Sequence, residues 1–342
     1  MKKFIVASSH LDAGLSNRLK SLISAMRLTQ KLSRTILLHW PLNFICGARF
    51  QELFETKIRE INTEELNNLY KKGEIKKCKN YEDCKTDDKF ILLDNWRFVL
   101  FPNEVKKEFA IVFPVKNKES IDLEYERTPK RLQRDFLKYV NKLTPKEEIR
   151  RNVELFLKKY DFSKIIGLHV RRTEFMITPD RRGFVSTDEK FFGKIKSILK
   201  NSPEKLFFLA TDSKKTEKNF IREFGNKIII LKNKDWDKSR SKSTRDALIE
   251  MLVLSKTNRI LGTYLSTFTE MAWWFSGCKA KVEIIGDEKQ KADVLKKALS
   301  PEVHTGRKSM IREIMKELRR KSSLFRKVLD FVMELKVKRR KM

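Results

Sequence analysis

Short apolar runs alternate with helix-like segments through the second half of the chain, and this alternation constrains the fold more than any other feature. The runs are rich in β-branched and aromatic residues, which is typical of buried strands. Regular β/α alternation predicts a doubly wound parallel sheet with right-handed crossovers. The expected strands are Ile165 to Val170, Lys205 to Ala210, Lys227 to Leu231, Arg259 to Gly262 and Lys281 to Ile285. The expected helices are Thr187 to Leu199, Thr216 to Phe224, Arg245 to Ser255 and Phe268 to Ser276.

The N-terminal part begins with a second α/β pattern. A strand from Phe4 to Ser8, a helix from Asn17 to Lys31 and a strand from Thr35 to His39 make a βαβ unit. Residues 43 to 160 are irregular and charged. They contain strand-like runs at 90–93 and 110–113, and helices expected from Pro129 to Leu143 and from Pro145 to Tyr160. We therefore expect an α/β protein with two Rossmann-like domains, residues 1–155 and 156–300.

Composition narrows the class of protein. With 342 residues and 40% hydrophobic content, the chain can bury two sizeable cores. No window approaches the roughly 20 apolar residues of a membrane span, and the N-terminal apolar stretch is interpreted as a first strand. Four cysteines are too few for a disulfide framework, and Cys78 with Cys84 lacks the further ligands of a zinc site. A reducing, cytoplasmic location is the expectation.

The net charge of +31 raises two possible partners. A nucleic-acid-binding protein is one reading, but the basic residues are spread along the chain and no nucleic-acid-binding motif is present. The excess of basic over acidic residues is largest in residues 301–342, and the pattern from Arg307 to Met342 predicts a basic amphipathic helix or helix pair. Such a tail can lie on an anionic membrane as a peripheral attachment, or it can pack on the protein with its charges in water.

In the second half of the chain, the residues at the end of the first expected strand form the clearest candidate for a binding site. His169, Arg171 and Arg172 follow the apolar run that begins at Ile165. Ligands of open α/β sheets bind at the carboxyl ends of the strands, and arginine forks suit phosphate oxygens. The cluster indicates a site for a phosphorylated ligand, such as a nucleotide. The alternative is a pair of arginines in ordinary surface ion pairs.

Two other loops join a strand end to a helix start. Gly14 to Leu19 forms one, and Gly262 to Phe268 forms the other. Free backbone N–H groups at such helix starts attract phosphate. Ser266 or Thr267 could instead be a simple N-cap. Asp246 and Glu250 lie about one helical turn apart, and they could bind a base or ribose or be surface acids.

Taken together, the three blocks resemble those of the fucosyltransferase superfamily, which includes core α1,6-fucosyltransferases, nodulation fucosyltransferases and protein O-fucosyltransferases. Gly14-Leu15-Ser16-Asn17-Arg18-Leu19 is similar to its Gly-x-Gly-Asn-Arg-Leu motif, with Ser16 in place of a glycine. His169-Val170-Arg171-Arg172 is similar to its His-x-Arg-Arg motif. Glu250 and Ser266-Thr267-Phe268 resemble its third block. The blocks stand in family order across residues 14–275.

The resemblance implies a GT-B-like fold, with two Rossmann-like domains facing a central cleft. It implies an inverting, metal-independent glycosyltransferase that uses a nucleotide-sugar donor, GDP-fucose by default, and a glycan or glycoconjugate acceptor. Another nucleotide sugar is the alternative within this class. Arg171 would hold the β-phosphate and Arg172 would support it. The catalytic base varies within the family; from its place in the loop after the arginine pair, Asp180 is the candidate base, ahead of Glu174. The donor would be bound by Asn17, His169, Glu250 (where the family usually has Asp), Ser266, Thr267 and Phe268, with no metal and no other cofactor.

Overall fold

The computed structural model describes most of the first 287 residues. The described ranges are 2–8, 13–78, 81–94, 98–101, 104, 120–121, 128–172, 185–264 and 266–287. Residues Met1–Lys291 form one compact unit. The predicted run at 110–113, the candidate bases Glu174 and Asp180, and the predicted basic tail of residues 301–342 lie outside the described residues.

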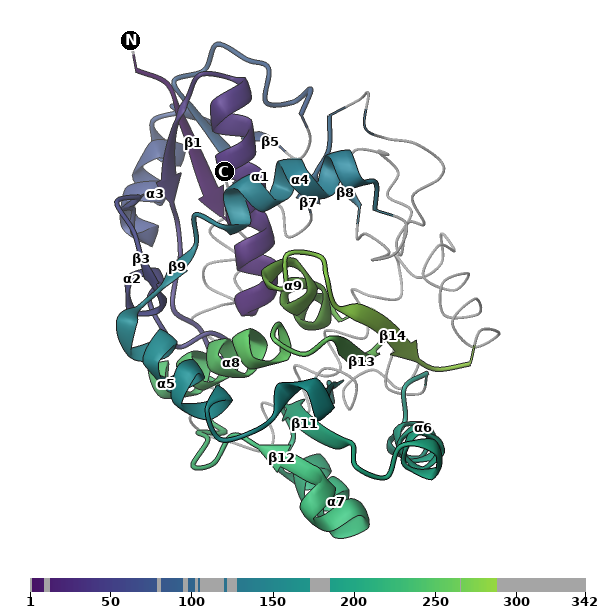
Figure 1. The fold of residues 1–342 in the computed structure, drawn as a ribbon. Helices are drawn as coiled ribbons and strands as arrows, with labels where there is room; N and C mark the ends of the chain where they lie inside the picture. The colour runs from purple at the N-terminus through teal and green to yellow at the C-terminus, as the bar shows by residue number, and fades with distance from the viewer. Residues whose placement is uncertain are drawn as a thin grey trace, which may run out of the picture. The chain divides into compact units, whose positions relative to one another are not determined.

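The first parallel sheet confirms the N-terminal βαβ unit and extends it. Its strand order is β4 (Arg59–Glu60), β2 (Thr35–Leu38), β1 (Phe4–Ser8), β6 (Phe90–Asp94) and β5 (Ile75–Cys78). All of its neighbouring strands run parallel. Helix α1 (Leu15–Lys31) packs against β1 (Figure 1). On the other face, Val6 and Leu92 meet Leu66 of α3 (Thr63–Lys71), so both faces are buried, as a parallel sheet requires.

The second parallel sheet is the doubly wound sheet that the β/α alternation predicted. The order is β12 (Ile228–Ile230), β11 (Leu206–Thr211), β10 (Ile165–Val170), β13 (Arg259–Thr263) and β14 (Lys281–Ile285). Helices α6 (Asp188–Asn201) and α7 (Lys214–Phe224) bury Phe191 and Phe220 against one face. Helices α8 (Ser241–Leu254) and α9 (Thr267–Phe275) pack on the other face (Figure 1). The α/β class and both parallel sheets are therefore confirmed.

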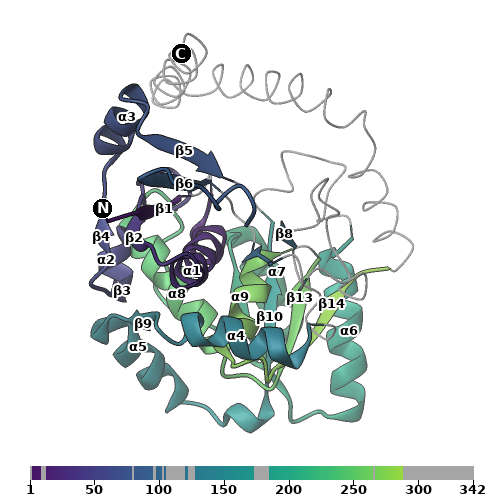
Figure 2. The ribbon, with the colours of Figure 1, turned by 90° about the horizontal axis from the view of Figure 1, so that it is seen from above.

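A single hydrophobic cluster connects the two sheets. It runs from β1 and α1 through α4 (Lys130–Val140) to α8 and α9. Trp274 of α9 is fully buried and contacts the rings of Phe98 and Phe136. Helix α1 lies next to α9 and α4 in both views (Figures 1 and 2). Helix α5 (Glu147–Leu157) packs on α8 and spans the predicted boundary at residue 155, which stays a prediction.

The main differences from expectation lie between residues 43 and 90, with smaller ones at the ends of helices elsewhere. Helix α3 was not foreseen because Leu66 is its only buried residue, although its capping box of Asn62 and Glu65 is visible in the sequence. Helix α8 begins at Ser241, four residues before the predicted Arg245. The prediction missed this first turn because it is polar and carries no apolar periodicity. Short elements complete the fold: α2 (Phe50–Leu53), β3 (Phe54–Glu55) paired with β9 (Thr144–Pro145), β7 (Phe98–Val99) paired with β8 (Ser120–Ile121), and 3-10 turns at Phe162–Lys164 and Gly225–Lys227.

The cysteines also differ from expectation. Cys78 and Cys84 form a disulfide with a Cα–Cα distance of 5.5 Å, at the end of β5. Disulfides persist mainly in oxidising compartments, whereas we expected a reducing, cytoplasmic location, which stays a prediction. Cys46 and Cys278 are free thiols. Among the helices of the described ranges, none is long and apolar enough to cross a bilayer.

Candidate active site

The ends of β10 and β13 lie side by side where the strand order reverses. His169 is in register with Gly262, while the chain leaves β10 toward β11 and β12 and returns to β13 on the other side. Ligands of doubly wound sheets bind at this switch point. A Cβ atom on Gly262 would lie 2.6 Å from Thr269, so the glycine allows α9 to approach the sheet closely. The predicted site residues at the end of β10, at the end of β13 and at the start of α9 therefore belong to one junction.

His169 is held inside this junction rather than exposed at its surface. Its side chain is 3% exposed, its Nδ1 atom lies 2.7 Å from Thr269 Oγ1, and its ring stacks on Phe268 at 4.6 Å. Burial lowers the pKa of His169 to about 3, with Asp212 opposing and Arg171 and Arg172 reinforcing the effect. The imidazole is therefore neutral at neutral pH, where it can donate or accept one hydrogen bond at its other ring nitrogen.

The low pKa of His169 makes stability depend on pH. The unfolded chain takes up this proton near pH 6.5, whereas the folded chain does so only near pH 3. Its contribution is fully present above pH 6.5 and is lost as the pH falls toward 3. Between pH 7 and pH 5 the wild type should lose about 2 kcal/mol more unfolding free energy than a folded His169→Gln variant, at 1.36 kcal/mol per pH unit. Urea unfolding of both proteins at the two pH values measures the difference, and equal losses would contradict a buried neutral His169.

Arg171 is positioned from two neighbouring strands. Its backbone N–H donates to Thr263 Oγ1 at 3.0 Å, and Thr263 Oγ1 in turn donates to the carbonyl of His169 at 2.9 Å. Its Nε atom lies 3.1 Å from Asp212 Oδ2 at the end of β11. Lys238 Nζ shares this oxygen at 2.9 Å. Asp212 therefore fixes the direction of the Arg171 guanidinium and gathers two cations at the carboxyl edge of the sheet.

Arg172 points to a different partner. Its Nε and Nη2 atoms donate to Asp188 Oδ1 at 3.1 and 2.6 Å, and its Nη1 atom donates to the carbonyl of Arg171 at 2.8 Å. Its backbone N–H donates to Asp212 Oδ1 at 2.8 Å. The guanidinium thus joins the end of β10 to the first turn of α6. This geometry suits the supporting role that the resemblance implies more than direct contact with a ligand.

The start of α9 supplies backbone and hydroxyl groups at the same edge. Ser266 is at the N-cap position, but its side chain makes no capping hydrogen bond, and the helix begins at Thr267. The simple cap that the sequence allowed is therefore not formed. The first N–H groups of a helix have no partner within it and attract anions. Phe268, in the first turn, lines the junction through its stacking on His169.

Glu250 is more enclosed than a base-binding acid was expected to be. Its carboxylate is buried, and Oε1 accepts a hydrogen bond from Lys234 Nζ at 2.7 Å. Lys234 also donates to the carbonyl of Thr211 at 3.0 Å, and it lies 3.3 Å from Glu217. Burial raises the pKa of Glu250 to about 7 against the opposing effect of Lys234. The network brings Glu250 to the end of β11, but with its carboxylate engaged.

Asn17 lies in the first turn of α1, on the other sheet. Its Oδ1 atom is buried and has no hydrogen-bond partner within the part of the chain that the structure describes. One turn farther along, the fully buried Lys20 pairs with Glu270 of α9 at 2.7 Å, and Trp274 Nε1 donates to the same carboxylate at 3.4 Å. The pair ties the helix that carries Asn17 to the helix that begins at Thr267.

The candidate base Asp180 falls outside the described residues, so its assignment stays a prediction. Within the described ranges, no group of three or more His, Cys, Asp or Glu side chains could hold a metal ion.

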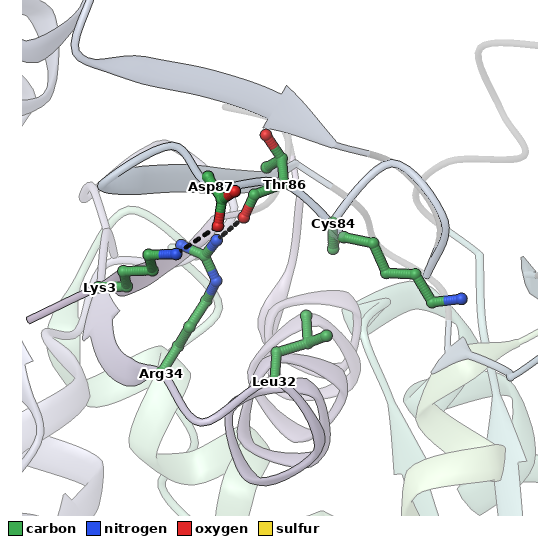
Figure 3. A pocket seen from close by; sticks show the side chains of 7 residues that line it. Lys3, Leu32, Arg34, Cys84, Thr86 and Asp87 are labelled. Atoms are coloured by element: carbon green, nitrogen blue, oxygen red, sulfur yellow. Dashed lines mark hydrogen bonds and ion pairs between the residues drawn. The ribbon is translucent and has the colours of Figure 1, made fainter.

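A surface cavity of about 400 Å³ lies at the opposite edge of the first sheet (Figure 3). It is lined by residues that precede strands, including Lys3 before β1 and Arg34 before β2. Lys3 Nζ pairs with Asp87 at 2.6 Å, and Arg34 donates to the carbonyls of Thr86 and Asp88. Ligands of parallel sheets bind at the carboxyl edge, so this cavity is not the candidate active site.

Several site residues were not predicted from the sequence. Asp212 could have been found, because it follows a predicted strand just as Arg171 does. Lys234, Lys238 and Asp188 gave no such signal, because each lies in a charged loop or at a helix start whose partners are 16 to 26 residues away. Only the packed structure identifies them as neighbours of the predicted residues.

Comparisons with known proteins agree with this architecture. No protein-family profile and no curated protein sequence matches the chain. Among solved structures, NodZ alpha-1,6-fucosyltransferase soaked with GDP-fucose aligns over 80% of this chain and 93% of its own, at 14% identity and a TM-score of 0.50. POFUT1 in complex with GDP aligns over 84% and 99%, at 11% identity and a TM-score of 0.50. A structure of NodZ from Bradyrhizobium covers 80% and 91%, at 16% identity and a TM-score of 0.49. The chain shares the fold of NodZ and POFUT1, as its motifs predicted.

Proposed function

We propose that the chain is an inverting, metal-independent glycosyltransferase. It transfers a sugar, fucose in the first instance, from GDP-fucose to a glycan or glycoconjugate acceptor. The observation that carries the proposal is Arg171, oriented by Asp212 at the switch point of the second sheet, beside an α9 N-terminus whose N-cap side chain leaves the helix uncapped. The three motif blocks and the fold shared with NodZ, which was soaked with GDP-fucose, support it.

The chemistry follows from where charge develops. Breaking the bond between the sugar and the diphosphate leaves negative charge on the departing phosphate oxygen while the sugar gains oxocarbenium character. A fixed guanidinium and helix N-terminal N–H groups stabilise such charge without reorganisation. Arg171 and the start of α9 supply these groups, Arg172 keeps the end of β10 in place, and Asp180 accepts the proton of the acceptor hydroxyl.

Another nucleotide sugar is the second candidate, and one observation favours it. Guanine offers N–H donors that suit a carboxylate, but Glu250 already accepts from Lys234 at 2.7 Å. Guanine recognition by Glu250 requires this ion pair to rearrange. A base richer in acceptors would need no such change, because Lys234 is itself a donor.

A nucleotide titration tests the proposal. Thermal unfolding is followed while GDP, UDP, ADP and CMP are added in the presence of EDTA. GDP should stabilise the chain selectively, by about 2.7 kcal/mol at a concentration 100 times its Kd. Preference for UDP would keep the transferase and discard fucose. Failure of all four nucleotides to bind would contradict a nucleotide-sugar enzyme.

Two further measurements complete the test. Turnover of GDP-fucose should be unchanged by EDTA, and a strict requirement for Mn²⁺ would contradict the metal-independent mechanism. A salt-sensitive gel shift with nucleic acid, together with absent GDP binding, would favour the alternative that the net charge of +31 raises.

A further inference from the structure

Arg18 carries a buried positive charge. Its side chain is 2% exposed. Its Nε atom donates to the carbonyl of Ala13 at 2.8 Å, its Nη1 atom donates to the carbonyl of Pro41 at 2.6 Å, and the guanidinium lies over the ring of Trp40 at 5.2 Å. Its Nη2 atom is buried, and no described residue gives it a hydrogen-bond partner. The guanidinium is thus enclosed by neutral groups, and its Nη2 donor makes no hydrogen bond to the described residues.

Three other buried cations of the described residues are paired with carboxylates, whereas Arg34 at the opposite edge of the sheet donates to backbone carbonyls. Lys20 pairs with Glu270, Arg27 with Asp135 and Glu104, and Lys234 with Glu250. Removing an ion from water is costly unless an opposite charge compensates it. Among the described residues, Arg18 has no such carboxylate. Burial accordingly lowers its pKa, with only Cys46 acting against this effect. Since burial also raises the pKa of the Cys46 thiol, that group is neutral at neutral pH.

The position of Arg18 adds a second unfavourable interaction. The bond to Ala13, directly before the N-cap Gly14, places the guanidinium at the N-terminus of the 17-residue α1. A helix N-terminus carries partial positive charge and favours anions over cations. No side chain caps α1, and its first turn contains no acidic residue. Two positive groups therefore meet, with no compensating acid among the described residues, and an anion bound there would relieve both.

The surroundings are those of a ligand site. Helix α1 follows β1 at the carboxyl edge of the first sheet, where doubly wound folds bind ligands (Figure 1). The neighbouring Asn17 holds a second buried atom without a partner among the described residues, its Oδ1. As an acceptor, this oxygen suits a sugar hydroxyl, which both the donor that the resemblance assigns to Asn17 and an acceptor bound beside it carry. An anion flanked by hydroxyls is the chemistry of an acidic sugar or a sugar phosphate.

We propose that Arg18 and the N-terminus of α1 bind a carboxylate or phosphate group of the acceptor, so that the enzyme acts on an acidic glycan or glycoconjugate. This inference rests on the proposed function. The donor diphosphate has its own cationic position at Arg171 and α9 on the second sheet, which leaves the anion site of the first sheet to the other substrate. The net charge of +31 favours a polyanionic acceptor as well.

Inorganic phosphate is the probe for this site. The full chain is saturated with GDP and titrated with phosphate in a calorimeter, with chloride holding the ionic strength constant. Phosphate should bind alongside GDP. Arg18→Met should weaken phosphate binding about tenfold or more, the loss of one hydrogen bond to a charged group, while the Kd for GDP stays within twofold. Arg18→Gln, which keeps an N–H donor for Ala13, should show the same loss if the Met variant does not fold.

Arg34→Met is the matched control. Arg34 is 9% exposed and also donates to backbone carbonyls, but it lies at the opposite edge of the same sheet (Figure 3). Its variant should bind phosphate like the wild type. The proposal is overturned if phosphate binds no better than chloride, if the Arg18 variants bind it normally, or if phosphate competes with GDP and Arg18→Met weakens GDP tenfold. If the wild type does not bind GDP, the proposed function fails, and the same titration without GDP still tests Arg18.

Discussion

Replacing Arg171 with alanine is expected to lower kcat by about 10²-fold or more, with the fold intact. The variant removes the guanidinium that Asp212 directs from the end of β11, at 3.1 Å. Loss of a preorganised donor affects the transition state more than the bound donor, because the leaving phosphate oxygen gains charge only as the bond breaks. The fall should therefore lie mainly in kcat, with a smaller change in KM.

Steady-state transfer from GDP-fucose measures the effect, and circular dichroism checks the fold. Arg222→Ala is the matched control, since this arginine is exposed on α7 and donates to Asn219 on the same helix. It should turn over like the wild type. Asp212→Asn should retain the shape of the positioning group but lose its charge, giving a fall of the same kind and smaller size. Near-native turnover by a folded Arg171→Ala variant would contradict the proposed role of Arg171 in stabilising the leaving group.

The second large effect is on stability. Lys20→Met should lower the free energy of unfolding by about 3–5 kcal/mol, because it removes the ammonium group that pairs with the buried Glu270 carboxylate. Lys20 is fully enclosed, and the two charged atoms are 2.7 Å apart. The pair also joins α1 to α9, so its loss should loosen the connection between the helices that carry Asn17 and Thr267. Urea unfolding with linear extrapolation gives the change.

A double variant separates the charge from the packing. Lys20→Met combined with Glu270→Leu removes both ions, and it should recover most of the loss, because apolar replacements of a buried ion pair are often neutral. The matched control is Lys196→Met, whose partner Glu223 lies in an exposed pair. That variant should change stability by about 1 kcal/mol or less. A loss of this small size in Lys20→Met would contradict a desolvated pair.

Much of the second half of the fold could be predicted from the sequence. Strands β10 and β14 have the predicted bounds, β13 is one residue longer at its end, and β11 and β12 differ from their predicted bounds by one residue at each end. Their apolar runs are buried on both faces, so the sequence pattern and the burial coincide. Between residues 43 and 90 the elements are short, half exposed and held by tertiary contacts. Local periodicity carries little information about such segments.

The candidate site divides in a similar way. His169 and Arg171 could be predicted as site residues because they follow a predicted strand. The direction of the chain alone determines which edge of a parallel sheet is the carboxyl edge, where ligands bind. The sequence could not show that Ser266 leaves α9 uncapped, that Arg172 is directed to Asp188, or that Lys234 occupies Glu250. Those outcomes depend on which side chains from distant segments meet after the sheets have packed.

By itself, therefore, the sequence determined the class of the fold, the parallel direction of its strands and the edge at which ligands bind. These properties follow from local hydrophobic spacing and backbone geometry. The tertiary structure decided which charges are compensated. Lys20, Arg27 and Lys234 found carboxylates on distant elements, whereas Arg18 found only carbonyls at the positive end of α1. Charge pairing in a low-dielectric interior depends on distances of a few ångströms between residues far apart in the chain, and no local pattern encodes them.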